Sequence, residues 1–176
     1  MAGEAAFTAS EEEYAAANRE WYRCFMRRRW PRLFLSAIGT GAALGTIIGV
    51  LDHGWDPVAI FASAVPPSLI GLVVPPAMYG FCRLTIPRRA RTLYRQHKTL
   101  QRPLRFAWSD EGLGYTTSTG TGSLAWRDLH RWAEGRGNFL FFVTDAMFYF
   151  IPKRVLSEAE ADDLRTVAGG SGLQRL

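Results

Sequence analysis

The chain has 176 residues, a formal net charge of +5 and a mean hydropathy near zero. This length allows one domain of ordinary size, or a small domain with an attachment. Its two cysteines, Cys24 and Cys82, are too few for a disulfide framework and form no CxxC pair, which leaves a zinc site without support. Charge is segregated: 33–51 and 57–82 contain no charged residue, whereas 83–105 contains eight basic residues and no acidic one. A uniformly soluble globular chain rarely has this pattern.

The first predicted element is a helix near the N-terminus. Ser10 and Glu13 have the spacing of a capping box, in which each side chain bonds the backbone amide of the other. We therefore expect a helix over about 11–30 that continues into the first apolar run. The segment 1–32 is treated as an N-terminal unit of its own, and the residues around Phe7 could add a strand to a later sheet.

Two apolar runs predict a transmembrane helical hairpin over 33–82. The run 33–51 would form a helix of about 28 Å at about 1.5 Å per residue, close to the hydrocarbon thickness of about 30 Å. The run 57–82 can span with tilt, and its two proline pairs are tolerated in membrane helices. Turn residues occupy 52–56 between the runs. A soluble protein with a buried hairpin is the alternative, but two adjacent uncharged runs of this length are uncommon in such cores.

Gly41, Gly45 and Gly49 recur every four residues inside the first run. A glycine in a helix interior costs about 1 kcal/mol relative to alanine in water, so a compensating contact is expected. In lipid, small residues let two helix backbones approach and gain van der Waals contact. We predict that the three glycines form the face against which the second span packs, with a homodimer contact as the alternative. Neither span contains an ionisable residue, which disfavours a transporter or channel.

Arginines predict the orientation of the hairpin. Basic residues precede the first span and follow the second, whereas the 52–56 loop has two aspartates and no Lys or Arg. The positive-inside rule then places both termini in the cytoplasm and the loop outside. The basic residues before the first span are Arg19, Arg23, Arg27, Arg28, Arg29 and Arg32.

The segment 83–102 predicts a basic juxtamembrane helix. Its basic residues step by three and four, opposite an apolar stripe, as in an amphipathic helix. We interpret the basic stripe as a candidate surface for anionic lipid. Nucleic acid would also suit a row of arginines, but the position beside a span favours lipid, and a topology signal on a solvated helix face is the plainer alternative. The stripe consists of Arg88, Arg91, Arg95, Lys98 and Arg102.

Past Pro103 the apolar pattern alternates with a period of two. Short runs separated by turn residues predict about six strands in a strongly bent antiparallel sheet. Ser157 and Glu160 form a second capping box, so one helix follows the strands. We expect a pleckstrin-homology-like (PH-like) domain over 103–172, closed by this helix, and a tail at 173–176. The tryptophans and the phenylalanines of 139–142 would supply much of its core.

No motif of this sequence indicates catalysis. The three histidines are scattered, and GxSxG, HExxH and phosphate-loop patterns are absent from the sequence. We therefore expect no catalytic, cofactor or metal site and no enzymatic activity. Lys153 and Arg154, which follow the last strand, are candidate contacts for a partner, with a solvated helix entrance as the alternative.

Four segments carry a family resemblance. They are FTASEEEY at 7–14, FAWSDEGL at 106–113, LAWRDLHRWAEGRGNFLFFV at 124–143 and FIPKRVLSEAEADDLR at 150–165. Their order resembles the YcxB-like family of bacterial membrane proteins. The resemblance implies the two-span hairpin and the C-terminal domain, and hence the bacterial inner membrane, but no established activity.

The sequence thus predicts an α+β membrane protein with a transmembrane helical hairpin and a cytoplasmic PH-like antiparallel domain. Two functions remain open. One is a non-enzymatic, membrane-anchored module that binds a protein or a lipid. The other is a membrane-embedded immunity or stress-protection protein. Neither involves nucleic acid, and the sequence leaves the oligomeric state open.

Overall fold

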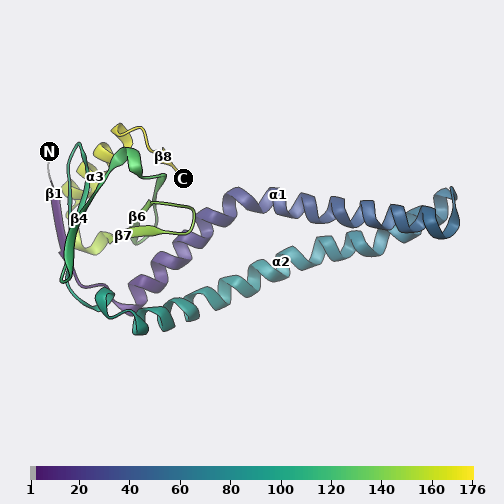
Figure 1. Ribbon diagram of the computed structural model, residues 1–176, viewed down its shortest axis with the longest axis horizontal. Helices are drawn as coiled ribbons and strands as arrows, with labels where there is room; N and C mark the ends of the chain where they lie inside the picture. The colour runs from purple at the N-terminus through teal and green to yellow at the C-terminus, as the bar shows by residue number, and fades with distance from the viewer. Residues whose placement is uncertain (1–2) are drawn as a thin grey trace. The chain divides into compact units, whose positions relative to one another are not determined.

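A computed structural model describes residues 3–176, which form an α+β protein (Figure 1). The chain divides into two compact units. The folded unit comprises the residues up to Cys24 together with Ile86–Leu176, and the hairpin unit comprises Phe25–Thr85. These boundaries differ from the predicted ones, because the start of the chain and the segment before Pro103 pack with the C-terminal strands and do not stand as separate segments.

Two long helices dominate the chain. Helix α1 (Glu11–His53) begins at the predicted capping box: the Glu13 amide donates to Ser10 Oγ at 3.1 Å, and the Ser10 amide donates to Glu13 Oε2 at 2.8 Å. Helix α2 (Pro57–Gln96) follows a short turn in which Gly54 has a φ of +64°, a conformation that glycine adopts without steric cost. Each predicted span is therefore part of a longer helix that also includes its basic flank.

The predicted helix over 83–102 ends earlier than expected, at Gln96. His97 leaves the helix, and a short 3-10 turn, η1 (Lys98–Gln101), follows. The Gln101 side chain folds back and donates to the Tyr94 carbonyl at 2.9 Å. The same carbonyl accepts from the His97 amide at 3.2 Å, so a backbone donor and a side-chain donor both bond it where the helix ends and the chain turns toward the first strand of the C-terminal region.

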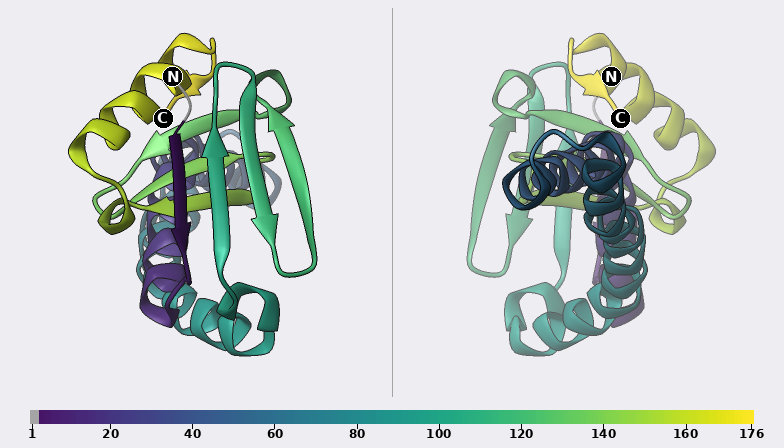
Figure 2. Two further views of the ribbon diagram at one scale, coloured as in Figure 1. Left: turned by 90° about the vertical axis from the view of Figure 1, so that its left-hand side faces the viewer. Right: turned by 90° about the vertical axis from the view of Figure 1, so that its right-hand side faces the viewer.

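Eight strands form two four-stranded sheets within residues 3–176, and the strands of one sheet cross those of the other (Figure 2). The first sheet has the order β1-β2-β3-β4 and is antiparallel. The second has the order β7-β6-β5-β8, in which only the β5–β8 pair is parallel. The strands are β1 (Gly3–Phe7), β2 (Leu104–Trp108), β3 (Gly112–Thr117), β4 (Gly120–Ala125), β5 (Arg131–Glu134), β6 (Asn138–Phe142), β7 (Phe148–Pro152) and β8 (Gln174–Arg175).

Strand β1 joins the sheet from the far end of the sequence. Gly3 lies opposite Trp108 and Phe7 opposite Leu104. A Cβ atom at Gly3 would lie 2.8 Å from the Trp108 indole nitrogen, so the indole occupies the space that a side chain would need. The strand expected around Phe7 is confirmed, and its pairing explains why the N-terminus belongs to the folded unit.

The core of the folded unit lies between the sheets and helix α3 (Glu158–Gly170). Every residue of β6 is buried, and Trp108, Trp126 and Trp132 are buried beside it, which confirms the predicted core. Helix α3 starts at the predicted second capping box, where Ser157 and Glu160 bond each other's backbone amides. It adds Ala161, Leu164 and Ala168 to the same core.

Candidate functional site

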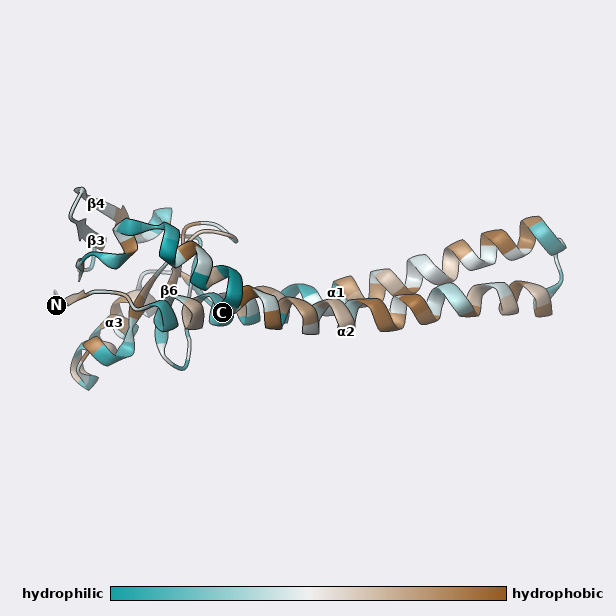
Figure 3. Ribbon diagram, turned by 90° about the horizontal axis from the view of Figure 1, so that it is seen from below, coloured by the Kyte–Doolittle hydropathy of each residue, from teal (hydrophilic) through white to brown (hydrophobic). Residues whose placement is uncertain are grey.

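The hairpin unit exposes an apolar surface. Both long helices are long and apolar enough to cross a membrane, and only 17% and 6% of their most apolar windows are buried. Figure 3 shows the hydrophobic residues along both helices. Large side chains face outward, among them Leu51, 78% exposed, and Phe61, 72% exposed. Apolar surface of this extent would be costly in water and is typical of contact with lipid or protein.

The three glycines of the first span lie against the backbone of α2. A Cβ atom at Gly41 would be 2.5 Å from the Pro67 carbonyl oxygen, and one at Gly49 would be 2.8 Å from the Ile60 Cα. Gly45 makes the same kind of contact between these two positions, and Gly71 of α2 approaches the Ala37 carbonyl in return. We call Gly41, Gly45 and Gly49 the glycine ladder. The structure places the glycine ladder on the contact face between the two helices, which is the intramolecular arrangement.

Hydroxyl groups inside the spans bond to their own helix. Ser63 Oγ donates to the Ala59 carbonyl at 2.9 Å, and Ser68 Oγ donates to the Ala64 carbonyl at 2.7 Å. In α1, Thr46 Oγ1 likewise donates to the Ala42 carbonyl, four residues earlier, at 2.9 Å. Polar groups of an apolar helix satisfied in this way need no water, so these hydroxyls are compatible with a hydrocarbon environment.

The two ends of the hairpin unit differ in charge. Asp52 and Asp56 lie at the connecting turn, where Trp55 is 87% exposed. At the other end the Trp30 ring contacts the Tyr79 ring, with centroids 5.2 Å apart. Tryptophan and tyrosine are enriched where a helix leaves a membrane. The arginines of this unit gather at the Trp30 end and are Arg27, Arg28, Arg29, Arg32 and Arg83.

The predicted basic stripe is divided by the structure. Arg88, Arg91 and Arg95 lie on α2 and are exposed, whereas Lys98 lies in η1 and Arg102 follows it. All five are exposed, but they do not share one helix face, because α2 ends at Gln96. Contact with anionic lipid stays a prediction for them.

Two residues of the predicted stripe have partners inside the folded unit. Arg95 donates two hydrogen bonds to the Glu11 carboxylate, at 3.1 and 3.0 Å. These bonds lower the pKa of Glu11. Arg102 donates to Ser118 Oγ at 3.1 Å. The members of the stripe on α2 that remain candidates for lipid contact are therefore Arg88 and Arg91.

Lys153 and Arg154, the predicted partner contacts, also bond within the folded unit. They lie in η3 (Lys153–Val155), directly after β7. Arg154 forms a two-pronged ion pair with Glu13 of α1 and donates to the Thr8 carbonyl at 3.2 Å. The hydrogen bonds from Arg154 lower the pKa of Glu13. Arg154 thus links η3 to the start of α1, and its contact with a partner stays a prediction.

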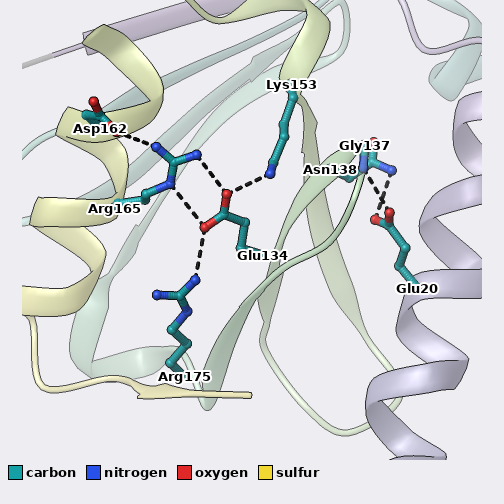
Figure 4. Close-up of polar contacts among 8 residues, drawn as sticks. All are labelled: Glu20, Glu134, Gly137, Asn138, Lys153, Asp162, Arg165 and Arg175. Carbon is teal, nitrogen blue, oxygen red and sulfur yellow. Dashed lines mark hydrogen bonds and ion pairs between the residues drawn. The ribbon is translucent and has the colours of Figure 1, made fainter. Parts of the chain in front are cut away.

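Lys153 belongs to a charge cluster around Glu134 of β5 (Figure 4). Glu134 accepts from Arg165 at 2.8 and 3.0 Å, from Lys153 at 2.6 Å and from Arg175 at 3.0 Å. The Glu134 side chain is only 12% exposed. Hydrogen bonds from Arg165 first, and then from Lys153, lower the pKa of Glu134 to about 2. One carboxylate thereby joins β5, η3, α3 and β8, which gives the cluster a structural role.

Glu20 of α1 is a buried carboxylate whose contacts the sequence did not predict. It is buried, yet its carboxylate accepts from the Gly137 amide at 3.0 Å and from Asn138 Nδ2 at 3.1 Å (Figure 4). A Cβ atom at Gly135 would lie 2.6 Å from Glu20 Oε1, so a side chain at this position would displace the Glu20 carboxylate from where it lies. Two features could have indicated this contact. Glu20 follows the buried Ala17 by three residues, and the GRGN turn contains two glycines.

A shallow cavity of about 490 Å³ lies at one end of the second sheet. Arg127, His130 and Asp145 are among the residues that line it, and the His130 and Asp145 side chains approach to 3.7 Å. Arg131 also approaches Asp145, at 3.5 Å. Within residues 3–176 no group of three His, Cys, Asp or Glu side chains is arranged to hold a metal ion. The cavity thus combines charges of both signs that already pair with each other.

These features define an α+β protein with a β-sheet domain and two long apolar helices that could span a membrane. Part of the sheet domain is similar to a known family: residues 108–168 match the family described as YcxB-like protein. The resemblance to this family is therefore confirmed, over a segment that runs from the end of β2 into α3. No curated protein matches the chain.

Proposed function

We propose that this protein is a non-enzymatic, membrane-anchored binding module of the bacterial inner membrane. The hairpin unit spans the bilayer, and both termini lie in the cytoplasm. One observation carries the proposal: the hairpin exposes large apolar side chains over two charge-free runs, and all its arginines lie at the end opposite the connecting turn. Apolar length and one-sided arginines are the two features that predict spanning and orientation.

The folded unit is the binding part of this proposal. We take its two crossed sheets and C-terminal helix as a PH-like domain held at the inner leaflet, because α1 and α2 connect it directly to the hairpin. Anionic phospholipid headgroups are the ligand that its charges favour. Arg88 and Arg91 are exposed on α2 only a few residues beyond the second span, and each basic residue near an anionic surface contributes about 1 kcal/mol. A protein partner at the same surface would be a further ligand of the module.

Cysteine labelling in intact cells tests the orientation. In a variant whose Cys24 and Cys82 are replaced by alanine, Gly54→Cys should react with a membrane-impermeant maleimide. Ser118→Cys, in the turn between β3 and β4, should react only after the cells are permeabilised. Both positions are exposed in the structure, so accessibility within the protein does not differ. Labelling of Ser118→Cys in intact cells, or release of the chain from membranes by alkaline carbonate, would contradict the proposal.

A further inference from the structure

An apolar groove of about 430 Å³ runs along the hairpin unit between α1 and α2. Its walls include Ala37, Thr40 and Gly41 of α1 and Ile70, Gly71 and Pro75 of α2. All these residues belong to the two charge-free runs. In the proposed orientation the groove therefore opens to the hydrocarbon of the inner half of the bilayer.

The glycines explain why a groove forms here. Gly41 lies against the Pro67 carbonyl and Gly71 against the Ala37 carbonyl, so the helices touch through backbone at this level. No side chain at either glycine fills the space beside the contact. Longer side chains such as Leu44 and Ile70 stand at the rim and are exposed. The groove is thus a furrow with a backbone floor and aliphatic edges, a shape that suits one flexible hydrocarbon chain.

Positive charge lies beyond one end of the groove. Arg32 is one helical turn before Ser36 and two before Thr40, and residues four apart share a helix face. On α2, Pro75, Tyr79 and Arg83 follow one another at the same spacing. Each helix therefore has an arginine within two turns of the groove, at the end of the hairpin unit where Trp30 contacts Tyr79. The two aspartates of the hairpin unit are at its opposite end.

We propose that the groove binds one acyl chain of an anionic phospholipid, whose phosphate pairs with Arg32 and Arg83. The inference rests on the proposed membrane function and deepens it, because it names a particular lipid site. A second copy of the chain is a poorer occupant. Two copies with the same membrane orientation would bring their arginine-rich ends together, and like charges repel, whereas a phosphate complements that charge.

Native mass spectrometry of the purified full chain in detergent tests the site. The probes are phosphatidylglycerol and phosphatidylcholine with the same acyl chains, and the measurement is the dissociation constant of the first bound lipid. We expect tighter binding of phosphatidylglycerol. The double variant Arg32→Gln/Arg83→Gln should weaken phosphatidylglycerol binding about 25-fold, from about fivefold for each arginine, and leave phosphatidylcholine binding unchanged.

A second variant tests the groove itself. Thr40→Phe places a ring in the groove and should weaken binding of both lipids. Its matched control is Thr46→Phe, at an exposed threonine of the same helix that does not line the groove. Arg136→Gln, at an exposed arginine of the folded unit, controls for loss of charge. Both controls should bind phosphatidylglycerol as the unmodified chain does.

The outcomes separate the two proposals. Equal binding of the two lipids, an unaffected Thr40→Phe variant, or equal losses in Thr40→Phe and Thr46→Phe would overturn the lipid site. A chain dimer in place of the lipid complex would overturn it as well. None of these results would alter the cysteine labelling, which tests the membrane function. Conversely, a chain that does not insert into membranes fails the proposed function whatever lipid it binds in detergent.

Discussion

Gly45 of α1 lies so close to Ser63 of α2 that a Cβ atom at Gly45 would be 2.5 Å from the Ser63 carbonyl oxygen. The contact joins two helices by their backbones, so neither side can move away by changing a rotamer. It gives the glycine ladder a physical purpose: close packing of two spans where apolar bulk alone provides no drive to associate.

The first prediction concerns this contact. Gly45→Ala should destabilise the hairpin by about 1–3 kcal/mol, the usual range for overpacking, even though alanine is the better helix former. The matched control is Gly39→Ala in the same helix, where a Cβ atom meets nothing within 4 Å. Thermal unfolding in detergent measures both. A Gly45→Ala variant as stable as Gly39→Ala would show that the helices do not pack through this face.

The second prediction concerns the pH dependence of stability. The folded-state pKa of Glu134 is about 2, below the ordinary value of about 4.5 for a glutamate. Its ionised form is therefore stabilised by folding, and this contribution is present above about pH 4.5 and lost as the pH falls toward 2. A pKa difference of this size corresponds to about 3 kcal/mol. We therefore expect Glu134→Gln to lower the free energy of unfolding at pH 7 by about 3 kcal/mol.

Urea unfolding of the full chain in detergent between pH 2 and pH 7 checks this prediction. The difference in free energy of unfolding between the unmodified chain and Glu134→Gln should shrink as the pH falls from about 4.5 toward 2. Glu111→Gln is the control, since Glu111 is an exposed glutamate in the turn between β2 and β3. A destabilisation of Glu134→Gln that stays constant from pH 7 to pH 2 would mean that the cation cluster does not act through the ionised carboxylate.

The third prediction concerns Glu20. Glu20→Ala leaves the Gly137 amide and the Asn138 side chain without their acceptor, and an unpaired buried donor costs about 1–3 kcal/mol. Glu20→Gln keeps one carbonyl oxygen and should be less harmful. Thermal unfolding measures the loss, and hydrogen exchange at the Gly137 amide should accelerate more in the alanine variant. Glu12→Ala, at an exposed position of the same helix, should change neither measurement.

The fourth prediction concerns the exposed arginines of α2. The intact chain is required, because a fragment beginning near Pro87 would lack β1 and the start of α1, which belong to the folded unit. We expect a fluorophore at Leu93→Cys, in the background without native cysteines, to be quenched by headgroup-labelled lipid in nanodiscs with anionic lipid. The quenching should weaken with salt, since the Debye length falls from about 10 Å at 0.1 M to about 3 Å at 1 M.

Arg88→Gln/Arg91→Gln should remove this interaction, worth about 2 kcal/mol at about 1 kcal/mol for each arginine. Arg136→Gln serves again as the charge control. Equal quenching in anionic and neutral nanodiscs would reduce the two arginines to a topology signal, without affecting the groove proposed for the hairpin unit.

The sequence by itself determined the features that depend on neighbouring residues. Both capping boxes form as predicted, because Ser10 and Glu13, like Ser157 and Glu160, satisfy each other within one helical turn. The apolar runs predicted two long helices with a turn at 52–56, and the family resemblance was found from short motifs in order. Trp108 and Trp132, which lie on strands, are buried as the apolar pattern predicted.

The tertiary structure alone decided which distant residues meet. Arg154 pairs with Glu13 across 141 positions of sequence, and Glu20 bonds Asn138 across 118. Lys153 was predicted as a partner contact, but folding brings Glu134 to it. At the end of α2, the Gln101 side chain folds back from beyond the helix and bonds the Tyr94 carbonyl. The periodicity of a sequence predicts which face of a helix or strand is apolar. It does not predict which segment covers that face, because this depends on contacts between segments that only folding brings together.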